Sequence, residues 1–286
     1  MSLLDQQGVF LPYLHLLGGP FGEPPRYSFE ERVAAAATDG VTGIGFDGDE
    51  FDTLLKTHTV DQLRGILADH GVTIGELQIL YGWHFGGDYG RMARQMEDHL
   101  YDLADQFDIK QVKTVIMTPT EFPPQEVLVE RFNGILDRAA DHGIRIALEP
   151  QSVNPGFDYA AAVDLILASG RKNAGFVVDG WHFFRDPDPY TALEKLPAEH
   201  IFGVELRDAT TEPQISRMED CLNYNLLPGE GDFDLVTLLR TLDAKGVDTP
   251  IAAEIMSNDL RKLSAQENID RTIAAVEKVM AAARAA

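Results

Sequence analysis

The sequence has little positive charge. Its 286 residues include 24 Lys and Arg against 46 Asp and Glu, which gives a formal net charge of −22. Affinity for DNA or RNA comes mainly from Lys and Arg that neutralise phosphates, and anionic lipid surfaces attract proteins in the same way. The shortage of cations therefore argues against nucleic-acid and membrane partners. Most of the acidic excess is expected on a solvated surface.

Cysteine and long apolar runs are also scarce. The single cysteine, Cys221, excludes an intrachain disulfide and fits a reducing compartment. No apolar run approaches the roughly 20 residues that span a bilayer. The N-terminal "MSLLDQQG" has no basic region and only a two-leucine apolar stretch, unlike a signal peptide. We therefore predict a soluble, cytoplasmic protein.

A repeated pattern places a glycine between a helix and a short apolar strand. It occurs in "ATDGVTGIGFD", "ADHGVTIGELQ", "ADHGIRIALEP" and "DAKGVDTPIAAE", where the glycines are Gly40, Gly71, Gly143 and Gly246. A glycine at this point accommodates the left-handed conformation that commonly ends a helix. The pattern predicts helices that are each followed at once by a strand.

Eight apolar runs alternate with amphipathic segments along the chain. The predicted strands are 9–13, 41–46, 72–80, 111–117, 144–148, 175–178, 201–204 and 251–253. The predicted helices are 28–39, 59–70, 89–107, 126–142, 157–168, 233–245 and 264–283. Strict alternation implies a parallel sheet, and eight units of this length favour one closed (β/α)8 TIM barrel over residues 1–286. An open doubly wound sheet is the alternative, but the prolines of "LLGGPFGEPP" oppose its phosphate loop.

Four neighbouring predicted strands each carry an acid at their C-terminal end. These acids are Glu149 in "IALEP", Asp179 in "FVVDG", Glu205 in "FGVEL" and Glu254 in "IAAEI". The C-terminal rim is where TIM barrels build their active sites. Because the strands are consecutive, we expect the carboxylates to point inward to one small volume.

Four carboxylates in one volume repel one another unless a cation lies between them. All-oxygen ligation suits Mn²⁺ or Mg²⁺ better than Zn²⁺. The alternative is a structural role, in which the acids cap the following helices or pair with Arg and Lys. The sequence therefore favours Mn²⁺, with Mg²⁺ or Co²⁺ as alternatives.

These motifs resemble those of the xylose isomerase-like TIM barrels. That family includes sugar isomerases, ketose 3-epimerases, inosose and dehydroshikimate dehydratases and the related AP-endonuclease group. The resemblance covers nearly the whole chain and rests on "ALEP", "VDGWH", "VELRD", "PGEGDFD" and the glutamate of the last strand. The resemblance implies Glu149, Asp179, Glu205 and Glu254 as metal ligands. Position 205 departs from the epimerase branch, which usually has His there, so whether Glu205 ligates stays open.

The resemblance also implies a reaction. A metal held by carboxylates polarises a substrate carbonyl, and a carboxylate then removes the neighbouring proton to give an enediolate. In the epimerase branch the residues that correspond to Glu149 and Glu254 flank the substrate as acid and base. Return of the proton gives an epimer or an isomer, whereas loss of a leaving group gives a dehydratase or lyase. The sequence does not choose between these outcomes.

Other side chains near the predicted rim are candidates for substrate contacts. His182 follows Asp179 by three residues and is expected to orient a ligand or to protonate a substrate oxygen. His15 and His84 follow the first and third strands. The aromatic residues Trp83, Trp181, Phe183 and Phe184 could pack on the apolar face of a sugar or on their own loops. Each of these residues has structural packing as its alternative role.

Charged residues near "PGEGDFD" bear on the substrate. Arg207 could bind a substrate oxygen, although balancing the charges of Glu205 and Asp208 is the preferred role. The three acids of "PGEGDFD" would repel a phosphate, and Asp232 is interpreted as a helix cap. The connection 209–227 that precedes this motif is long enough to be a lid. We therefore predict a non-phosphorylated keto or aldo sugar, or a cyclitol, as substrate.

The leading hypothesis is a metal-dependent sugar isomerase or epimerase. A dehydratase or lyase that uses the same site is the second hypothesis. An endonuclease is disfavoured by the net charge of −22. A non-catalytic sugar-binding subunit is a further alternative. Homo-oligomerisation is plausible for this family, although the sequence identifies no interface.

Overall fold

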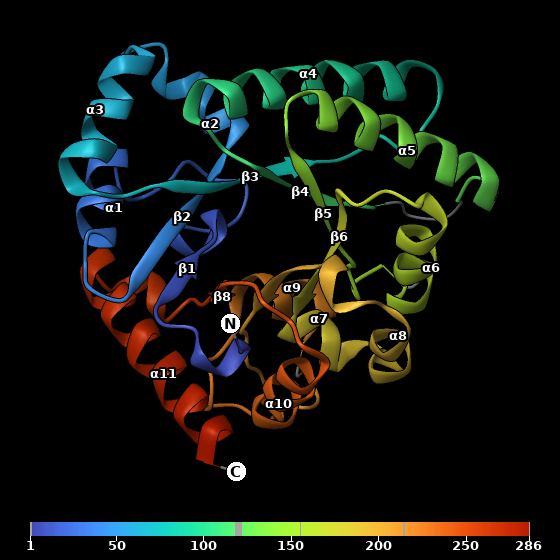
Figure 1. Ribbon diagram of the computed structural model, residues 1–286. Coiled ribbons are helices and arrows are strands. Elements are labelled where there is room, and N and C mark those ends of the chain that lie inside the picture. The colour runs from blue at the N-terminus through green and yellow to red at the C-terminus, as the bar shows by residue number, and fades with distance from the viewer. Residues whose placement is uncertain (1, 118–121, 155, 214, 286) are drawn as a thin grey trace.

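The strands of the chain close into a barrel. The structure, a computed structural model, describes residues 2–117, 122–154, 156–213 and 215–285. Within these ranges the strands lie in the order β1 to β8 and are all parallel, with β8 paired to β1 (Figure 1). Their bounds are β1 Val9–Leu11, β2 Val41–Asp47, β3 Ile74–Leu80, β4 Gln111–Val115, β5 Arg145–Glu149, β6 Ala174–Asp179, β7 Ile201–Glu205 and β8 Ile251–Ala252. This confirms the predicted (β/α)8 barrel.

Helices connect the strands and surround them. The longer helices are α1 Phe29–Ala36, α3 Val60–His70, α4 Gly87–Phe107, α5 Gln125–Asp141, α6 Tyr159–Ser169, α10 Leu235–Lys245 and α11 Ala265–Ala285. All seven were predicted. Four shorter helices were not: α2 Gly48–Leu54, α7 Gly180–Arg185, α8 Pro189–Lys195 and α9 Arg217–Asn223. Each is six or seven residues long, which is too short to show a helical period in the sequence.

Local sequence signals fix several helix ends. Ser28 and Glu31 form a reciprocal capping box at the start of α1. Helices α3 and α10 end at Gly71 and Gly246, which have φ values of 67° and 84°. A side chain is strained in this left-handed conformation, so glycine is favoured at both positions. The predicted helix-to-strand punctuation is therefore present at these two sites.

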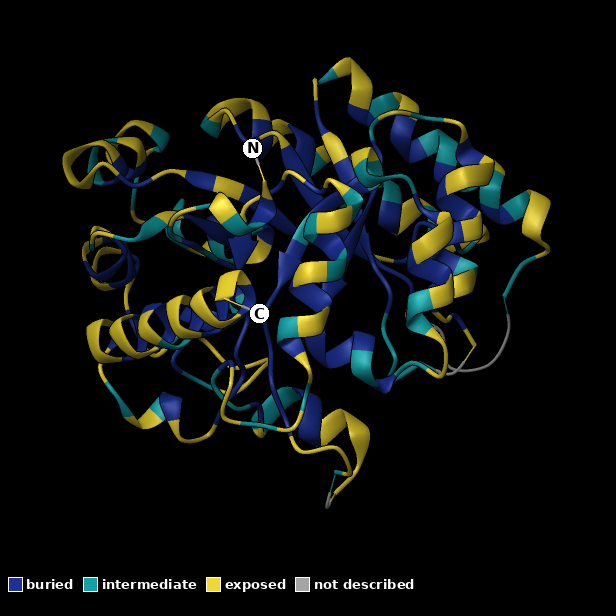
Figure 2. Cartoon of the chain, turned by 60° about the horizontal axis from the view of Figure 1, so that its bottom comes forward, coloured by how far each residue is buried: buried dark blue, intermediate teal, exposed yellow. Residues whose placement is uncertain are grey.

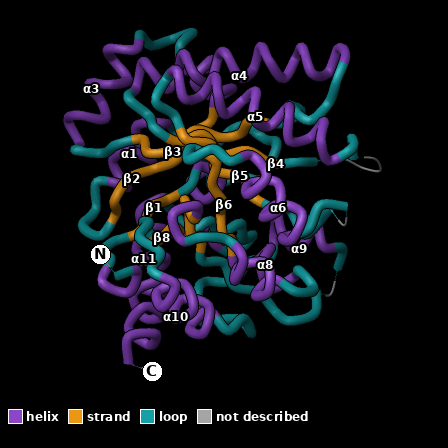
Figure 3. The backbone as a smooth tube through the Cα atoms, turned by 45° about the vertical axis from the view of Figure 1, so that its right-hand side comes forward, coloured by secondary structure: helices purple, strands orange, loops and turns teal. Residues whose placement is uncertain are grey.

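The main core lies between the barrel and its helices. Figure 2 shows buried residues on the strands and on the inner sides of the helices, and Figure 3 shows the strands enclosed by helices. Leu100 and Leu103 of α4 are 2% and 1% exposed. Burying a leucine side chain contributes about 1.5–3 kcal/mol, so such positions hold the outer helices to the barrel. No helix in the described ranges is long and apolar enough to span a membrane.

The inside of the barrel is polar over much of its length. A small apolar cluster of Ala147, Val177 and Phe202 fills one part. Fully buried charged side chains, which include Lys113 of β4 and Glu205 of β7, occupy other parts. TIM barrels usually fill this space with layers of branched apolar side chains. Buried charged side chains inside the barrel therefore mark its axis as the candidate functional region.

Candidate active site

The four predicted rim carboxylates meet inside the barrel. Glu149, Asp179 and Glu205 are the last residues of β5, β6 and β7, and Glu254 follows β8 by two residues. Each is at most 3% exposed. One oxygen from each carboxylate lies within 4.8 Å of those of the other three. The strand-end positions read from the sequence thus converge on one buried volume.

Lys113 of β4 lies among these acids and was not anticipated from the sequence. Its Nζ lies 2.5 Å from Glu205 Oε1, 3.5 Å from Glu254 and 3.8 Å from Glu149. Glu76 of β3 is 3.7 Å away on the other side. In register, Lys113 is opposite Ala147, so it lies two residues deeper in the barrel than Glu149.

Arg207 supplies a second cation from the β7 side. Its guanidinium lies 3.4 Å from Asp179 and 3.6 Å from Glu254. It also donates to the Asn225 side chain at 3.0 Å and to the Cys221 carbonyl at 2.8 Å. The preferred electrostatic role is therefore correct in kind, but the predicted partners Glu205 and Asp208 are wrong.

Asp208 instead organises the "PGEGDFD" loop. Its carboxylate accepts hydrogen bonds from the backbone N–H groups of Ala209, Gly229 and Phe233. The prediction that Asp232 caps the next helix is also wrong, because Asp234 caps α10 by accepting from Thr237 N–H. These acids accept hydrogen bonds from backbone N–H groups of the loop and of the start of α10.

A cavity of about 260 Å³ lies at the opposite end of the barrel, where the strands begin. Gln111 and Arg145, the first residues of β4 and β5, line it together with Glu76, Phe202 and Glu205. Gln111 donates to Glu76 at 2.6 Å, and the Arg145 guanidinium lies over the Phe202 ring. Buried polar side chains therefore continue from the rim carboxylates to this end of the barrel.

Burial controls the ionisation of the cluster. Burial raises the pKa of Glu149 to about 8, although Lys113 partly opposes the increase. Burial also raises the pKa values of Asp179, Glu205 and Glu76 above their usual range. Burial alone would lower the pKa of Lys113, but the surrounding glutamates hold it well above 10.5. Lys113 is therefore a fixed ammonium ion and is unsuited to act as a nucleophilic amine.

The cluster has an excess of negative charge. It contains five acids and three basic side chains: Glu76, Glu149, Asp179, Glu205 and Glu254, with Lys113, Arg145 and Arg207. If all eight are ionised, the excess is two negative charges, which one divalent cation would neutralise. Glu149 Oε1, Glu205 Oε2 and Glu254 Oε1 have no hydrogen-bond partner in the described part of the chain. Buried acceptors without donors and this excess charge both fit a divalent ion.

His182 faces the cluster with a hydrogen-bond donor. Its Nδ1 accepts from Ser152 N–H at 3.1 Å, so in the neutral ring the proton lies on Nε2. Nε2 is 3.7 Å from Glu149 Oε1. Burial, with Arg207 and Lys113 nearby, lowers the pKa of His182 well below its usual value. Although Glu149, Asp179 and His182 also cluster closely, a protonated Nε2 cannot ligate a metal.

The other two candidate histidines differ in their surroundings. His15 has both ring nitrogens occupied, with Ile255 N–H at 3.2 Å and the Thr272 hydroxyl at 3.3 Å. This arrangement leaves neither nitrogen free for a substrate. His84 is 1% exposed, and among the described residues neither of its ring nitrogens has a partner. His84 therefore remains the better substrate candidate of the two.

The candidate aromatic side chains are used for packing. Trp83 Nε1 donates to the Thr114 hydroxyl at 2.8 Å, and its ring packs on Phe132. Phe183 is fully buried, and Phe184 stacks on Phe233. Their predicted alternative role, structural packing, accounts for these contacts, although Trp83 packs on β4 and α5 rather than within its own loop.

Helix α9 covers the rim through Trp181 and Cys221. Trp181 Nε1 donates to Asp220 of α9 at 2.8 Å, and Trp181 and Cys221 share an apolar cluster with Met256. Burial raises the pKa of the Cys221 thiol to about 12, so this cysteine is not an activated nucleophile. Of the predicted lid segment, α9 thus contacts Trp181 through Asp220 and Arg207 through Cys221, and a lid function stays a prediction.

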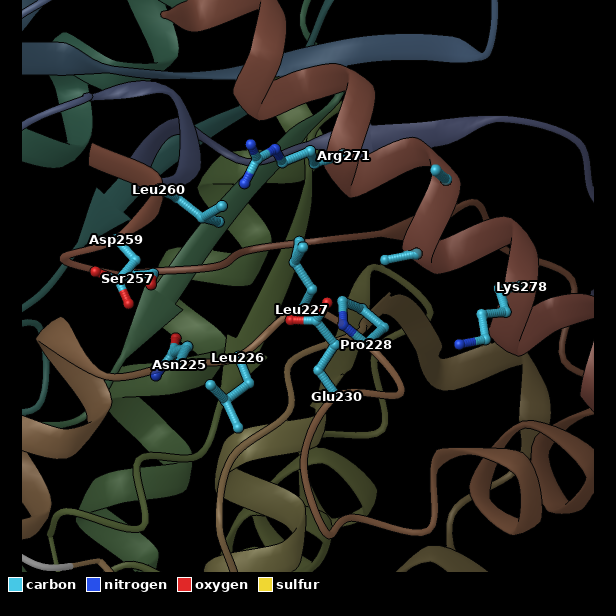
Figure 4. Close-up of a pocket in the computed structure, with 12 residues that line it drawn as sticks. Asn225, Leu226, Leu227, Pro228, Glu230, Ser257, Asp259, Leu260, Arg271 and Lys278 are labelled. Carbon is cyan, nitrogen blue, oxygen red and sulfur yellow. The ribbon is translucent and has the colours of Figure 1, made fainter. Parts of the chain in front are cut away.

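A larger cavity of about 590 Å³ lies outside the barrel (Figure 4). Arg271 and Lys278 of α11 border it on one side. Leu227 and Pro228, from the loop between α9 and α10, border the other. Asn225, which receives the Arg207 hydrogen bond, is its link to the cluster. This cavity is therefore separate from the buried acids.

Comparison with known proteins identifies the family. The family model described as "Xylose isomerase-like TIM barrel" matches residues 33–279. The chain is a member of this family. The family membership confirms the resemblance read from the strand-end motifs.

Two relatives of this xylose isomerase-like barrel show the range of activities. It is 26% identical over 244 residues to an inosose isomerase of Halalkalibacterium halodurans, covering 80% of this chain and 84% of that protein. It is 27% identical over 249 residues to a 3-dehydroshikimate dehydratase of Pseudomonas aeruginosa, covering 83% of this chain. The chain spans 37% of the length of that dehydratase. Both relatives are enzymes, one an isomerase and one a dehydratase.

Solved structures share the fold of this barrel. A zinc-bound IOLI protein matches with a TM-score of 0.83 and 19% identity, covering 96% of this chain and 98% of that one. A magnesium-bound xylose isomerase-like barrel of Mycobacterium smegmatis matches with a TM-score of 0.69 and 15% identity, covering 99% of each. D-Psicose 3-epimerase of Clostridium cellulolyticum matches with a TM-score of 0.71 and 11% identity, covering 96% and 98%. These likenesses show the fold alone.

Proposed function

We propose that this protein is a divalent-metal-dependent isomerase or epimerase of a small, non-phosphorylated sugar or cyclitol. The observation that carries the proposal is the set of rim carboxylates, which are buried, close together and partly without hydrogen-bond donors. Such a set is unfavourable without a cation. The relatives named inosose isomerase and 3-dehydroshikimate dehydratase support a reaction of this kind.

The metal would be held by carboxylate oxygens of Glu149, Asp179 and Glu254, with Glu205 as a fourth candidate. When bound there, a divalent cation polarises a carbonyl oxygen and makes the neighbouring C–H more acidic. The oxygen-only donor set favours Mn²⁺ or Mg²⁺, and Co²⁺ is a further candidate. Relatives of the same fold bind zinc and magnesium, which supports a divalent ion without identifying it.

Proton transfer is assigned to Glu149 and Glu254. Glu149 Oε1 has no hydrogen-bond partner among the described residues, which leaves this oxygen free to accept a substrate proton. Glu254 lies on the other side of the carboxylate cluster, beyond β8, where it can act on the opposite face of the substrate. His182 would donate from Nε2 to a substrate oxygen near Glu149.

Elimination is the competing outcome of the same proton abstraction. A dehydratase needs an acid that protonates a leaving hydroxyl, and the Nε2 proton of His182 is placed to do this. The His182→Gln variant separates the two reactions. An isomerase variant should keep both slow proton exchange with deuterium and slow product formation, whereas a dehydratase variant should keep exchange and lose product formation.

The first experiment is metal analysis of the wild type and Glu149→Ala after loading with Mn²⁺. We expect about one metal ion per wild-type chain and a strong loss in the variant. A panel of ketoses, aldoses and inososes in D₂O then tests proton exchange by NMR. A wild type that binds no metal and exchanges no substrate proton would overturn the proposal and leave a sugar-binding subunit as the alternative.

Partners are proposed from the charge of the chain. The net charge of −22 disfavours nucleic acid and anionic membranes as partners. A cytoplasmic location and a homo-oligomeric state stay predictions. Size-exclusion chromatography with light scattering tests the second.

A further inference from the structure

Glu205 has a different partner from the other rim carboxylates. Its Oε1 lies 2.5 Å from Lys113 Nζ, which is a hydrogen-bonded ion pair. The same ammonium lies 3.5 Å from Glu254 and 3.8 Å from Glu149, which is too far for a hydrogen bond. Glu205 is also the only acceptor that Lys113 Nζ has within the described ranges.

Glu205 also faces a different space. Its side chain lines the cavity at the N-terminal end of the barrel, together with Glu76 and Gln111. In register it lies opposite Ala252, and Glu254 comes two residues after Ala252. Glu205 also lies opposite Asp179 of β6, so the cavity that it lines, rather than its depth, distinguishes it from the other rim acids.

The other three acids have partners that come from the rim. Arg207 lies between Asp179 and Glu254, at 3.4 Å and 3.6 Å. His182, which follows β6, faces Glu149 at 3.7 Å. Lys113 is also within ion-pair distance of Glu254 and Glu149, but among the four rim acids only Glu205 accepts a hydrogen bond from it.

We propose that Glu205 is the permanent counter-ion of Lys113, and that Glu149, Asp179 and Glu254 hold the divalent cation without it. The inference rests on the metal site of the proposed function. The 4.8 Å spacing of the four acids permits Glu205 to ligate, so distance does not decide the question. Repulsion between cations decides it, because a metal ion on the free Oε2 of Glu205 would lie close to the Lys113 ammonium that Oε1 of the same carboxylate holds.

This assignment divides the interior charges into three neutral groups. Glu205 balances Lys113, and the charges of Glu76 and Arg145, which line the same cavity, offset each other. Glu149, Asp179 and Glu254 then carry three negative charges, which Arg207 and one divalent cation neutralise. A cation held by three protein carboxylates keeps coordination positions open for substrate oxygens or water. Lys113 is accordingly a positioning residue that keeps one acid away from the metal.

Manganese affinity tests the assignment. Glu205→Gln and Glu254→Gln are matched variants, because the substitution is the same and the two side chains are 3% and 2% exposed. Isothermal titration of metal-free protein with Mn²⁺ should give a Kd about tenfold above wild type for Glu205→Gln, the low end of the effect for residues outside the coordination shell. Glu254→Gln should bind at least ~100-fold more weakly, because it removes a charged ligand. An equal loss in both variants would overturn the inference.

A double variant covers the case in which Glu205→Gln fails to fold. Lys113→Met with Glu205→Gln removes both charges, so we expect it to unfold at a higher temperature than Glu205→Gln alone and to bind Mn²⁺ within about tenfold of wild type. If the double variant is no more stable than the single one and loses metal affinity ~100-fold, Glu205 is a ligand.

The two parts of the test fail separately. A wild-type protein that binds no Mn²⁺ overturns the proposed function and, with it, the three-ligand site. The ion pair is still measured by the metal-free stability cycle of wild type, Lys113→Met, Glu205→Gln and the double variant. A coupling energy near zero in that cycle overturns the pairing of Lys113 with Glu205, whatever the metal does.

Discussion

The raised pKa of Glu149 predicts how the metal-free protein responds to pH. This carboxyl group has an ordinary pKa of 4.5 and a folded-state pKa of about 8, chiefly because it is buried. Between these values the folded state binds a proton that the unfolded state has lost. The resulting stabilisation is complete below pH 4.5 and is lost as the pH rises through 8.

The size of the effect follows from the same two values. Each pH unit between them corresponds to about 1.36 kcal/mol, so Glu149 alone contributes a decrease of up to ~5 kcal/mol across the window. Replacing Glu149 by Gln removes the titrating group and keeps the shape of the side chain. We therefore expect Glu149→Gln to lose less stability than the wild type between pH 5 and about pH 8.5.

Urea unfolding in EDTA, followed by circular dichroism at several pH values, measures this difference. Glu277→Gln, on the exposed side of α11, is the control and should follow the wild-type curve. Parallel curves for wild type and Glu149→Gln would refute the reasoning. Saturating Mn²⁺ should remove the loss of wild-type stability at high pH, because it binds the ionised carboxylates.

Three further predictions test separate parts of the structure. Arg207→Met should destabilise the metal-free protein by about 3–5 kcal/mol, because it removes the guanidinium that lies beside buried Asp179 and Glu254. Urea unfolding measures this loss, and an unchanged midpoint would contradict the pairing. Cys221 should react with a disulfide reagent at least ~100-fold more slowly in native than in urea-unfolded protein, and rapid native labelling would show that α9 leaves the thiol accessible. Ser28→Ala should reduce the free energy of unfolding by about 1 kcal/mol through loss of the α1 cap, whereas Ser28→Thr, which keeps a hydroxyl, should retain most of it.

The long elements were predictable because their signals are local. A capping box begins α1, a glycine ends α3, and eight apolar runs mark the strands. The short helices α2 and α9 also begin at capping residues, Asp47 and Ser216, but seven residues are too few to show a helical period. Their positions follow from packing on the barrel, which the sequence does not display.

The rim contacts show the same division. The sequence placed His15, Trp83 and Trp181 after strands, which made them candidates for substrate contacts. Their actual partners are Thr272, Thr114 and Asp220, which lie 257, 31 and 39 residues away in the chain. Hydrogen bonds across such separations depend on which helices and strands become neighbours, and a pattern of residue types does not specify this.

The sequence by itself determined the barrel and the ring of carboxylates, because parallel strands that end in acids must bring those acids to one rim. The tertiary structure alone decided how their charge is balanced. Lys113 stands in the middle of the apolar strand "QVKTV", and its position was a signal that sequence reasoning missed. A buried lysine needs an acid, but only the closed barrel shows that the acid is Glu205, 92 residues away. Strand order and register set which charges meet across the barrel, and they exist only once all eight strands have closed.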